Sequence, residues 1–153
     1  MGELHRKKHL VHYWQVALCD VANKAGYPQG ETGDESVLGG RGGVVVTTAT
    51  DVEVEIVVID SETKPPEGYV NLACIEITVG GEGLKVGNET TADTSVVPCP
   101  MGRVHVGVFT NNADKRAVTS VVFRLTSVVT PSRQAVDAKI FLRMALEVKE
   151  SKS

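Results

Sequence analysis

Long apolar runs, which a membrane-spanning helix would need, are missing from this sequence. Its uninterrupted apolar runs are only a few residues long, whereas roughly 20 consecutive apolar residues are needed to cross a bilayer. The first residues, MGELHRKKHLVHYW, also lack the apolar centre and the small-residue cleavage site of a signal peptide. We therefore expect a cytoplasmic protein that makes no contact with a membrane.

Cysteine is scarce as well. Cys19, Cys74 and Cys99 are too few and too far apart for a disulfide framework or a CxxC metal site. We expect them to be free thiols that are buried as small hydrophobic side chains, and we expect no cofactor.

Positive charge and aromatic residues are also in short supply. The chain has 16 Lys and Arg against 19 Asp and Glu, so its formal net charge is −3, whereas binding to nucleic-acid phosphates requires a basic surface. Aromatic residues make up 5% of the chain, which leaves few for the exposed ring platform of a sugar-binding sandwich. These shortages exclude general nucleic-acid binding and weaken the case for carbohydrate binding.

Alternation is the feature that the sequence has in abundance. In DVEVEIVVID, residues 51–60, aliphatic residues at the even positions alternate with Glu53 and Glu55. A period of two is typical of a strand with one buried and one solvated face. Similar segments separated by glycine, proline or asparagine turns predict further strands. The expected strands include 9–19, 44–48, 51–60, 69–79, 84–86, 104–109 and 118–129.

Eight or nine short strands without a convincing long helix predict an all-β protein: a single-domain antiparallel β-sandwich, jelly-roll-like, with little helix. Strands 44–48 and 51–60 are close enough to form a tight hairpin. Residues 1–8 are interpreted as a charged N-terminal arm, 20–43 as a long Gly-rich and acidic loop, and 149–153 as a tail. Residues 131–148 alternate as a strand would, with a helix as the alternative.

The candidates for catalysis and metal binding are weak. His5, His9 and His12 cluster near the start, but in a strand neighbouring positions point to opposite faces, which does not suit a shared metal ion. Cys99 lies between two prolines and six residues before His105, yet no nucleophile motif surrounds it. We expect neither catalytic nor metal-binding residues.

The stronger candidate is a protein-binding surface of one charge. Acidic residues are frequent within residues 31–67, where Arg41 and Lys64 are the only basic ones. Such a surface can steer onto a basic partner, and the alternative is an ordinary solvated face. Arg41 lies in GGRGG, which leads into a strand and not a helix, so a turn is favoured over a phosphate loop. The candidate partner-binding residues are Glu31, Asp34, Glu35, Arg41, Glu53 and Glu55.

Several short motifs resemble those of small bacterial β-sandwich proteins related to the competence protein J family. They are HYWQ at 12–15, GGRGG at 39–43, PP at 65–66 after the alternating strand, and PMGRV at 100–104. The resemblance covers about residues 9–148. It implies a cytoplasmic β-sandwich that binds and inhibits a DNA-entry nuclease, and it assigns no inhibitory residue.

The sequence therefore favours a non-enzymatic protein-binding sandwich, of the nuclease-inhibitor or immunity type, that acts through the acidic loop and strand face. The alternative is a self-assembling structural subunit, such as a shell or decoration protein, that forms homo-oligomers. A hydrolase or metal enzyme is a third and weaker hypothesis.

Overall fold

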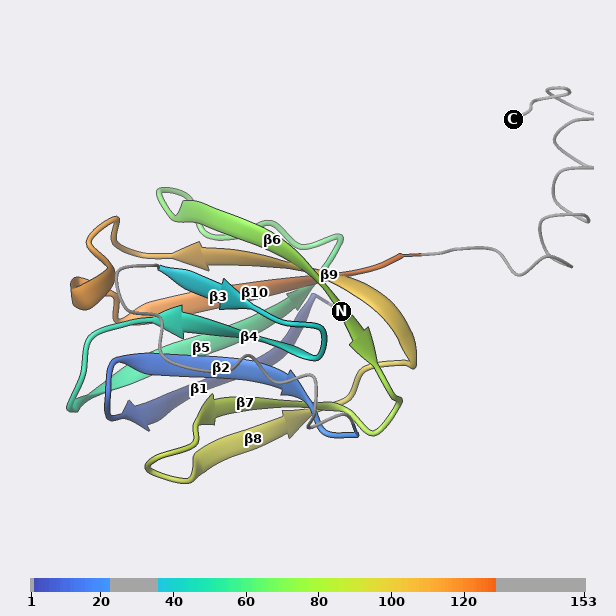
Figure 1. Cartoon of the computed structure of the whole chain (residues 1–153). Helices are drawn as coiled ribbons and strands as arrows, with labels where there is room; N and C mark the ends of the chain where they lie inside the picture. The colour runs from blue at the N-terminus through green and yellow to red at the C-terminus, as the bar shows by residue number, and fades with distance from the viewer. Residues whose placement is uncertain (1, 23–35, 129–153) are drawn as a thin grey trace, which may run out of the picture.

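Two five-stranded sheets face each other in the computed structural model (Figure 1), which describes residues 2–22 and 36–128. Sheet A runs in the order β1 (Glu3–Val11), β5 (Val52–Asp60), β10 (Ser120–Ser127), β9 (Gly102–Thr110) and β6 (Val70–Val79). Sheet B runs in the order β3 (Val37–Gly39), β4 (Gly43–Thr47), β2 (Gln15–Asp20), β7 (Leu84–Asn88) and β8 (Asp93–Val97). A 3-10 helix, η2 (Lys115–Ala117), precedes β10.

The all-β sandwich predicted from the alternating segments is confirmed, but its details differ. The described residues form ten strands rather than eight or nine. Sheet A is mixed, because β5 and β10 run parallel while the other pairs are antiparallel, and the structure does not show a jelly-roll order. Local alternation predicts a strand but contains no information on its partner's direction, which is why the purely antiparallel prediction was wrong.

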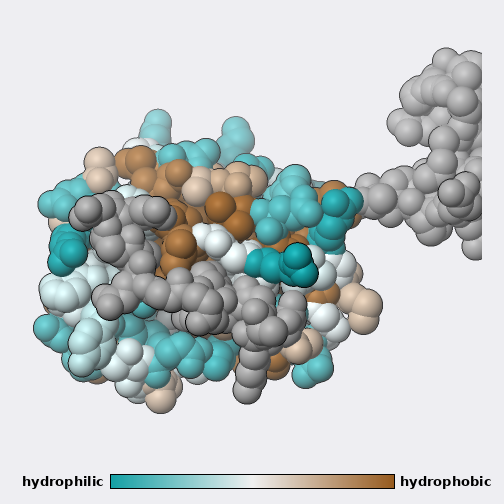
Figure 2. All heavy atoms as spheres, in the orientation of Figure 1, coloured by the Kyte–Doolittle hydropathy of each residue, from teal (hydrophilic) through white to brown (hydrophobic). Residues whose placement is uncertain are grey.

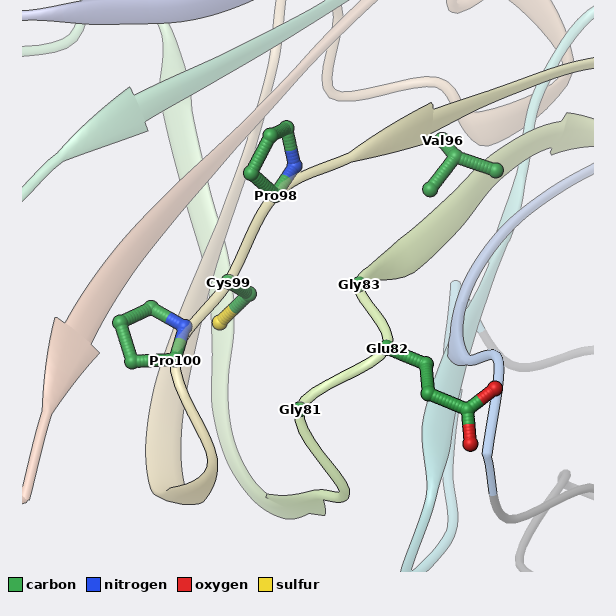
Figure 3. A pocket seen from close by; sticks show the side chains of 7 residues that line it. All are labelled: Gly81, Glu82, Gly83, Val96, Pro98, Cys99 and Pro100. Carbon is green, nitrogen blue, oxygen red and sulfur yellow. The ribbon is translucent and has the colours of Figure 1, made fainter.

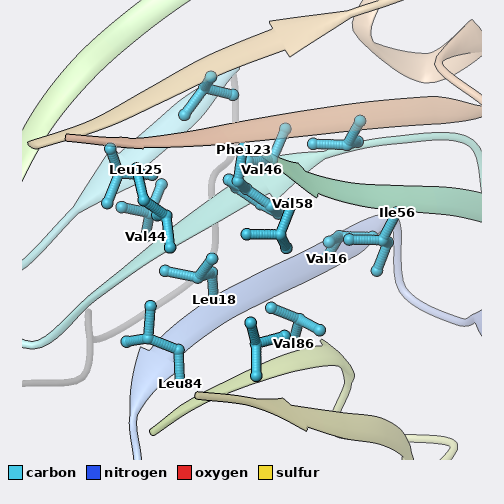
Figure 4. Packing of buried hydrophobic residues seen from close by; sticks show 14 of the residues in the cluster. Val16, Leu18, Val44, Val46, Ile56, Val58, Leu84, Val86, Phe123 and Leu125 are labelled. Carbon is cyan, nitrogen blue, oxygen red and sulfur yellow. The ribbon is translucent and has the colours of Figure 1, made fainter. Parts of the chain in front are cut away.

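The core lies between the two sheets, where the inward side chains of both interdigitate (Figure 4). Sheet B contributes mainly valine and leucine from β2, β4 and β7, while Ile56, Val58 and Phe123 come from sheet A. Each is fully buried. Burial of one such side chain stabilises the fold by about 1.5–3 kcal/mol, so the alternating valines specify this sandwich.

Strand β5 is buried more completely than its pattern predicts. Val54, Ile56 and Val58 face the core as expected, whereas Val52 at the strand's start is exposed. On the outer face, Val57 and Ile59 form a second apolar cluster. That cluster also contains Val122 from β10, with Tyr69 and Phe109 packed against it.

Three predicted boundaries were wrong. The charged arm is part of β1, which pairs with β5 over its whole length. The strand expected at 9–19 is two strands, β1 in sheet A and β2 in sheet B, joined by the turn at residues 12–14. Strands β4 and β5 are not a hairpin, because their connection crosses from sheet B to sheet A. In the last two cases the chain changes sheet at a short connection, which alternation alone does not reveal.

The glycine-rich turn joins β3 to β4, as the sequence predicts, with Gly40 N–H donating to the Gly43 carbonyl at 2.8 Å. Gly39 allows β3 to approach β6, because a Cβ there would lie 2.9 Å from Ile75 Cγ2. Ile75 packs, partly buried, against the core, and Figure 2 shows hydrophobic residues gathered over this side of the molecule. Residues 23–35 and 129–153, on which several predictions fell, lie outside the described residues.

No helix among the described residues is long and apolar enough to span a membrane.

Candidate protein-interaction site

The predicted acidic surface divides into a part that the structure describes and a part that it does not. Glu31, Asp34 and Glu35 lie outside the described residues. Glu53 is exposed and Glu55 half-buried on β5, but β5 runs between β1 and β10. Glu53 and Glu55 therefore lie on a sheet face and not on a free strand edge.

Basic residues of β1 lie beside the β5 glutamates. Arg6 Nη1 donates to Glu55 Oε2 at 3.0 Å, and Arg6 Nε donates to Glu3 Oε1 at 2.9 Å. Lys8 stands opposite Glu55 in the strand register. Because these cations compensate the carboxylates, the β5 face does not present charge of one sign. A role for Glu53 and Glu55 in partner binding stays a prediction.

Arg41 is exposed in the turn between β3 and β4, which comes before β5 in the chain. Its carbonyl oxygen accepts a hydrogen bond from Thr78 N–H at 2.9 Å, which ties the turn to β6. The structure thus gives the Arg41 backbone a structural role and does not bring its side chain together with Glu53 or Glu55.

Backbone strain is concentrated at one end of the sandwich. In the described part of the chain, four residues other than glycine have positive φ: Tyr13 (61°), Trp14 (55°), Asp51 (60°) and Ala92 (59°). They lie in the β1–β2, β4–β5 and β7–β8 connections, which Figure 1 shows at the same end. A side chain in this conformation costs about 1–2 kcal/mol, and such strain is typical of functional sites.

The strained turn at residues 12–14 is fixed by hydrogen bonds to its carbonyl groups. The buried Asn88 Nδ2 donates to the carbonyls of His12 at 2.8 Å and Gln15 at 2.7 Å. Thr48 N–H donates to the Trp14 carbonyl at 3.0 Å. These bonds hold the backbone of the turn from inside the protein, and its aromatic side chains face outward.

Two aromatic side chains project from this turn. Tyr13 is 68% exposed and Trp14 38% exposed. The guanidinium of Arg116, from η2, lies over the Trp14 ring, with Cζ 4.6 Å from the centroid, a distance typical of a cation–π contact. Tyr, Trp and Arg are the residues that most often dominate the binding energy of protein interfaces.

A pocket of about 430 Å³ adjoins the aromatic turn. His12 Nδ1 lies 2.7 Å from Asp51 Oδ1 on its wall, and Asp51 N–H donates to the Val11 carbonyl at 2.7 Å. We call this region, made of His12, Tyr13, Trp14, Asp51 and Arg116, the aromatic end. The residues lining its pocket are His12, Tyr13, Trp14, Thr50, Asp51 and Thr90.

The opposite end has a hollow of about 440 Å³ along the β8–β9 connection (Figure 3). Pro98, Cys99 and Pro100 form one side of it, and the turn at 81–83 faces them. Cys99 is buried, and burial raises the pKa of its thiol, which opposes formation of a nucleophilic thiolate. His105 Nε2 instead lies 3.1 Å from Glu76 Oε1, so the sequence pairing of Cys99 with His105 is not formed.

The other cysteines and the histidine cluster take structural positions. Cys19 is buried as predicted, while Cys74 is exposed, contrary to prediction. His5 Nε2 and the buried His9 Nε2 are 3.1 Å apart, and His9 Nδ1 contacts Asp93. Among the residues that the structure describes, no group of three or more His, Cys, Asp or Glu side chains could hold a metal ion.

The fold is a two-sheet β-sandwich whose aromatic end presents Tyr13 and Trp14 from a strained turn. No protein-family model matches the sequence, and no curated protein matches it either. Among solved structures, the fold resembles ComJ from Bacillus subtilis, described as an inhibitor of the DNA-degrading activity of NucA. The match has a TM-score of 0.63 at 12% identity and covers 84% of this chain and 99% of ComJ.

A second solved structure, the product of crocagin biosynthetic gene J, is also similar. Its TM-score is 0.53 at 12% identity, with 84% of this chain and 97% of that chain covered. At this identity the two likenesses establish the fold, and the expected resemblance to competence protein J is confirmed at that level.

Sequence reasoning missed the aromatic end. The segment His12–Gln15 is predicted as the middle of a strand, because large side chains at both its odd and its even positions suggest burial on both faces. The available signal was an aromatic pair flanked by polar residues between two aliphatic segments. Neither the sign of φ nor the distant Asn88 and Arg116 contacts could be inferred from it.

Proposed function

We propose that this chain is a non-enzymatic protein-binding sandwich that inhibits a nuclease, and that it acts in the cytoplasm. Its likeness to ComJ over nearly the whole of that chain supports the class of partner. The observation that carries the proposal is the rigid aromatic turn, where Tyr13 and Trp14 are held outward in a strained backbone.

The geometry suits binding better than catalysis. An anchored turn loses little conformational entropy on association, so more of the contact energy appears as affinity. The cysteine nearest to a pocket has a raised thiol pKa, which disfavours covalent chemistry there. We therefore assign the aromatic end to contact with the nuclease.

Affinity capture followed by a nuclease assay tests this function. The immobilised full-length chain is incubated with native lysate of its source cells, and retained protein is tested for DNA degradation before and after release in high salt. We expect DNA-degrading activity that is silent while bound and emerges on release. Retention of no nuclease, or of one that stays active while bound, would contradict the proposal.

The test variant is the double substitution Tyr13→Ala/Trp14→Ala, and the matched control is Val96→Ala/Met101→Ala at the other end. Val96 and Met101 are also exposed hydrophobic residues, at 59% and 76%. Loss of nuclease retention in the first variant but not the second supports the aromatic end. Equal loss in both, or retention by both, would assign the contact elsewhere. The alternative function, that of a self-assembling subunit, is tested separately by light scattering of the purified chain.

A further inference from the structure

We infer that the pocket at the aromatic end receives an arginine or lysine side chain of the protein partner. The inference rests on the proposed function and names the chemistry of its contact. The pocket, of about 430 Å³, exceeds the volume of one long side chain, and it combines aromatic walls with a carboxylate.

The carboxylate of Asp51 supplies the charged acceptor. Its side chain is 72% exposed, and the His12 contact uses Oδ1, 2.7 Å from His12 Nδ1, so Oδ2 can accept from a second donor. The backbone of Asp51 is fixed by its bond to the Val11 carbonyl at 2.7 Å. A carboxylate held in this way can accept a charge-assisted hydrogen bond from a guanidinium or ammonium group.

The aromatic rings suit the apolar stem and the cation of the same side chain. Trp14 already receives a guanidinium, that of Arg116, at 4.6 Å from its ring centroid. Arg116 does not line the pocket, so a side of the Trp14 ring remains for another group. Long basic side chains place their methylene stems against apolar surface while the charged head stays in a polar environment. The exposed Tyr13 ring suits the stem, and the neighbouring Asp51 suits the charged head.

Charge complementarity favours this occupant over an anionic one. A phosphate or carboxylate in the pocket would face the Asp51 carboxylate, whereas a cation is attracted to it. The chain's net charge of −3 also steers association toward basic partners. Thr50 and Thr90, which line the pocket as well, are neutral and can accept hydrogen bonds from the same cation.

A pair of small probes tests the pocket without any nuclease. N-acetyl-arginine methylamide is titrated into the isotope-labelled full-length chain, and its uncharged citrulline counterpart serves as control, with NMR shifts of the Trp14 indole and the Asp51 amide followed. We expect saturable shifts with the arginine probe, of millimolar affinity, and none with the citrulline probe. Equal shifts with both probes, or none with either, would overturn the inference.

Two variants test whether the Asp51 carboxylate is the group that binds the arginine probe. Asp51→Asn retains a residue that tolerates positive φ while removing the carboxylate, and should weaken arginine-probe binding about threefold to fivefold. Glu82→Gln makes the same charge change at an exposed position between β6 and β7, outside the pocket, and should leave binding unchanged. If both variants weaken binding equally, the effect is general electrostatics and the pocket assignment is wrong. Because nuclease retention is measured separately, failure here leaves the proposed function standing.

Discussion

The guanidinium of Arg116 lies over the indole of Trp14 at 4.6 Å from the ring centroid, and this contact joins the β1–β2 turn to the β9–β10 connection. The two residues are about 100 positions apart in the chain. Their contact ties the turn that crosses from sheet A to sheet B to a connection within sheet A.

Removal of the Arg116 guanidinium should expose Trp14. We expect Arg116→Ala to shift the tryptophan emission to longer wavelength and to lower the free energy of unfolding by about 0.5–1 kcal/mol, the range for an exposed cation–π contact. The chain has one tryptophan, so the spectrum reports this site alone. Arg116→Lys should give a smaller shift, and an unchanged Arg116→Ala spectrum would contradict the contact.

Asn88 should be indispensable for the aromatic turn. Asn88→Asp keeps the acceptor oxygen that bonds Thr91 N–H at 2.9 Å but removes both donors to the His12 and Gln15 carbonyls. The two part-buried carbonyls then lose this donor and face a carboxylate, so we expect a loss of about 2–4 kcal/mol in urea unfolding. A variant as stable as the parent chain would mean that Asn88 does not anchor the turn.

Gly87 in β7 should not tolerate a side chain. Its φ is +136°, and a Cβ would clash with the Asp93 carbonyl oxygen, so Gly87→Ala combines backbone strain with a clash between β7 and β8. We expect a loss of more than about 2 kcal/mol. Gly68→Ala is the matched control, because Gly68 has φ +88° and a Cβ added there would meet nothing within 4 Å. Similar losses for both variants would show that the strand contact is unimportant.

Acidification should weaken the fold in two steps. Burial, followed by the nearby His9 and Lys7 charges, lowers the pKa of His5 below 6.5. The unfolded chain therefore binds this proton more readily, and stability that is complete above about pH 6.5 declines as the pH falls toward the folded-state pKa. A hydrogen bond from Leu10 N–H lowers the pKa of Asp93 below 3.8, so its contribution is lost only at still lower pH.

Urea midpoints measured at about pH 7.5 and about pH 5 test the upper step. His5→Gln should reduce the difference between the two midpoints. His105→Gln, which changes an exposed histidine paired with Glu76, should leave the difference nearly as it is. If His105→Gln has the larger effect, the His5–His9 pair is not the origin of the upper step.

Individual strands were predictable because burial leaves a period of two in the sequence. Val104, Val106 and Val108 alternate along β9 and all face the core. The sheet to which a strand belongs was not predictable, since β4 and β5 are both rich in valine and are separated by only four residues, yet lie in different sheets. Sheet membership depends on the path of a connection. The positive φ of a residue such as Asp51 cannot be inferred from its residue type either.

From the sequence, the charges of the candidate site could be predicted only as an excess of acidic residues, and not as the charge of a folded surface. Glu53 and Glu55 were correctly placed on the polar face of a strand, but the pairing of β1 with β5 brings Arg6 and Lys8 beside them. This pairing joins segments nearly 50 residues apart, so the compensation could not be seen in a local window. The aromatic end likewise depends on contacts of Trp14 with residues distant in sequence.

The central claim is that the exposed, strained Tyr13 is retained for binding and not for stability. Tyr13→Asn tests both parts, because asparagine tolerates positive φ better than tyrosine and the lost ring is 68% exposed.

The most direct measurement is a titration of the captured nuclease with the Tyr13→Asn variant, together with its urea unfolding curve. We predict a variant at least as stable as the parent chain, and more stable by up to about 1 kcal/mol, that inhibits DNA degradation at least about tenfold more weakly. Undiminished inhibition by this variant would contradict the account.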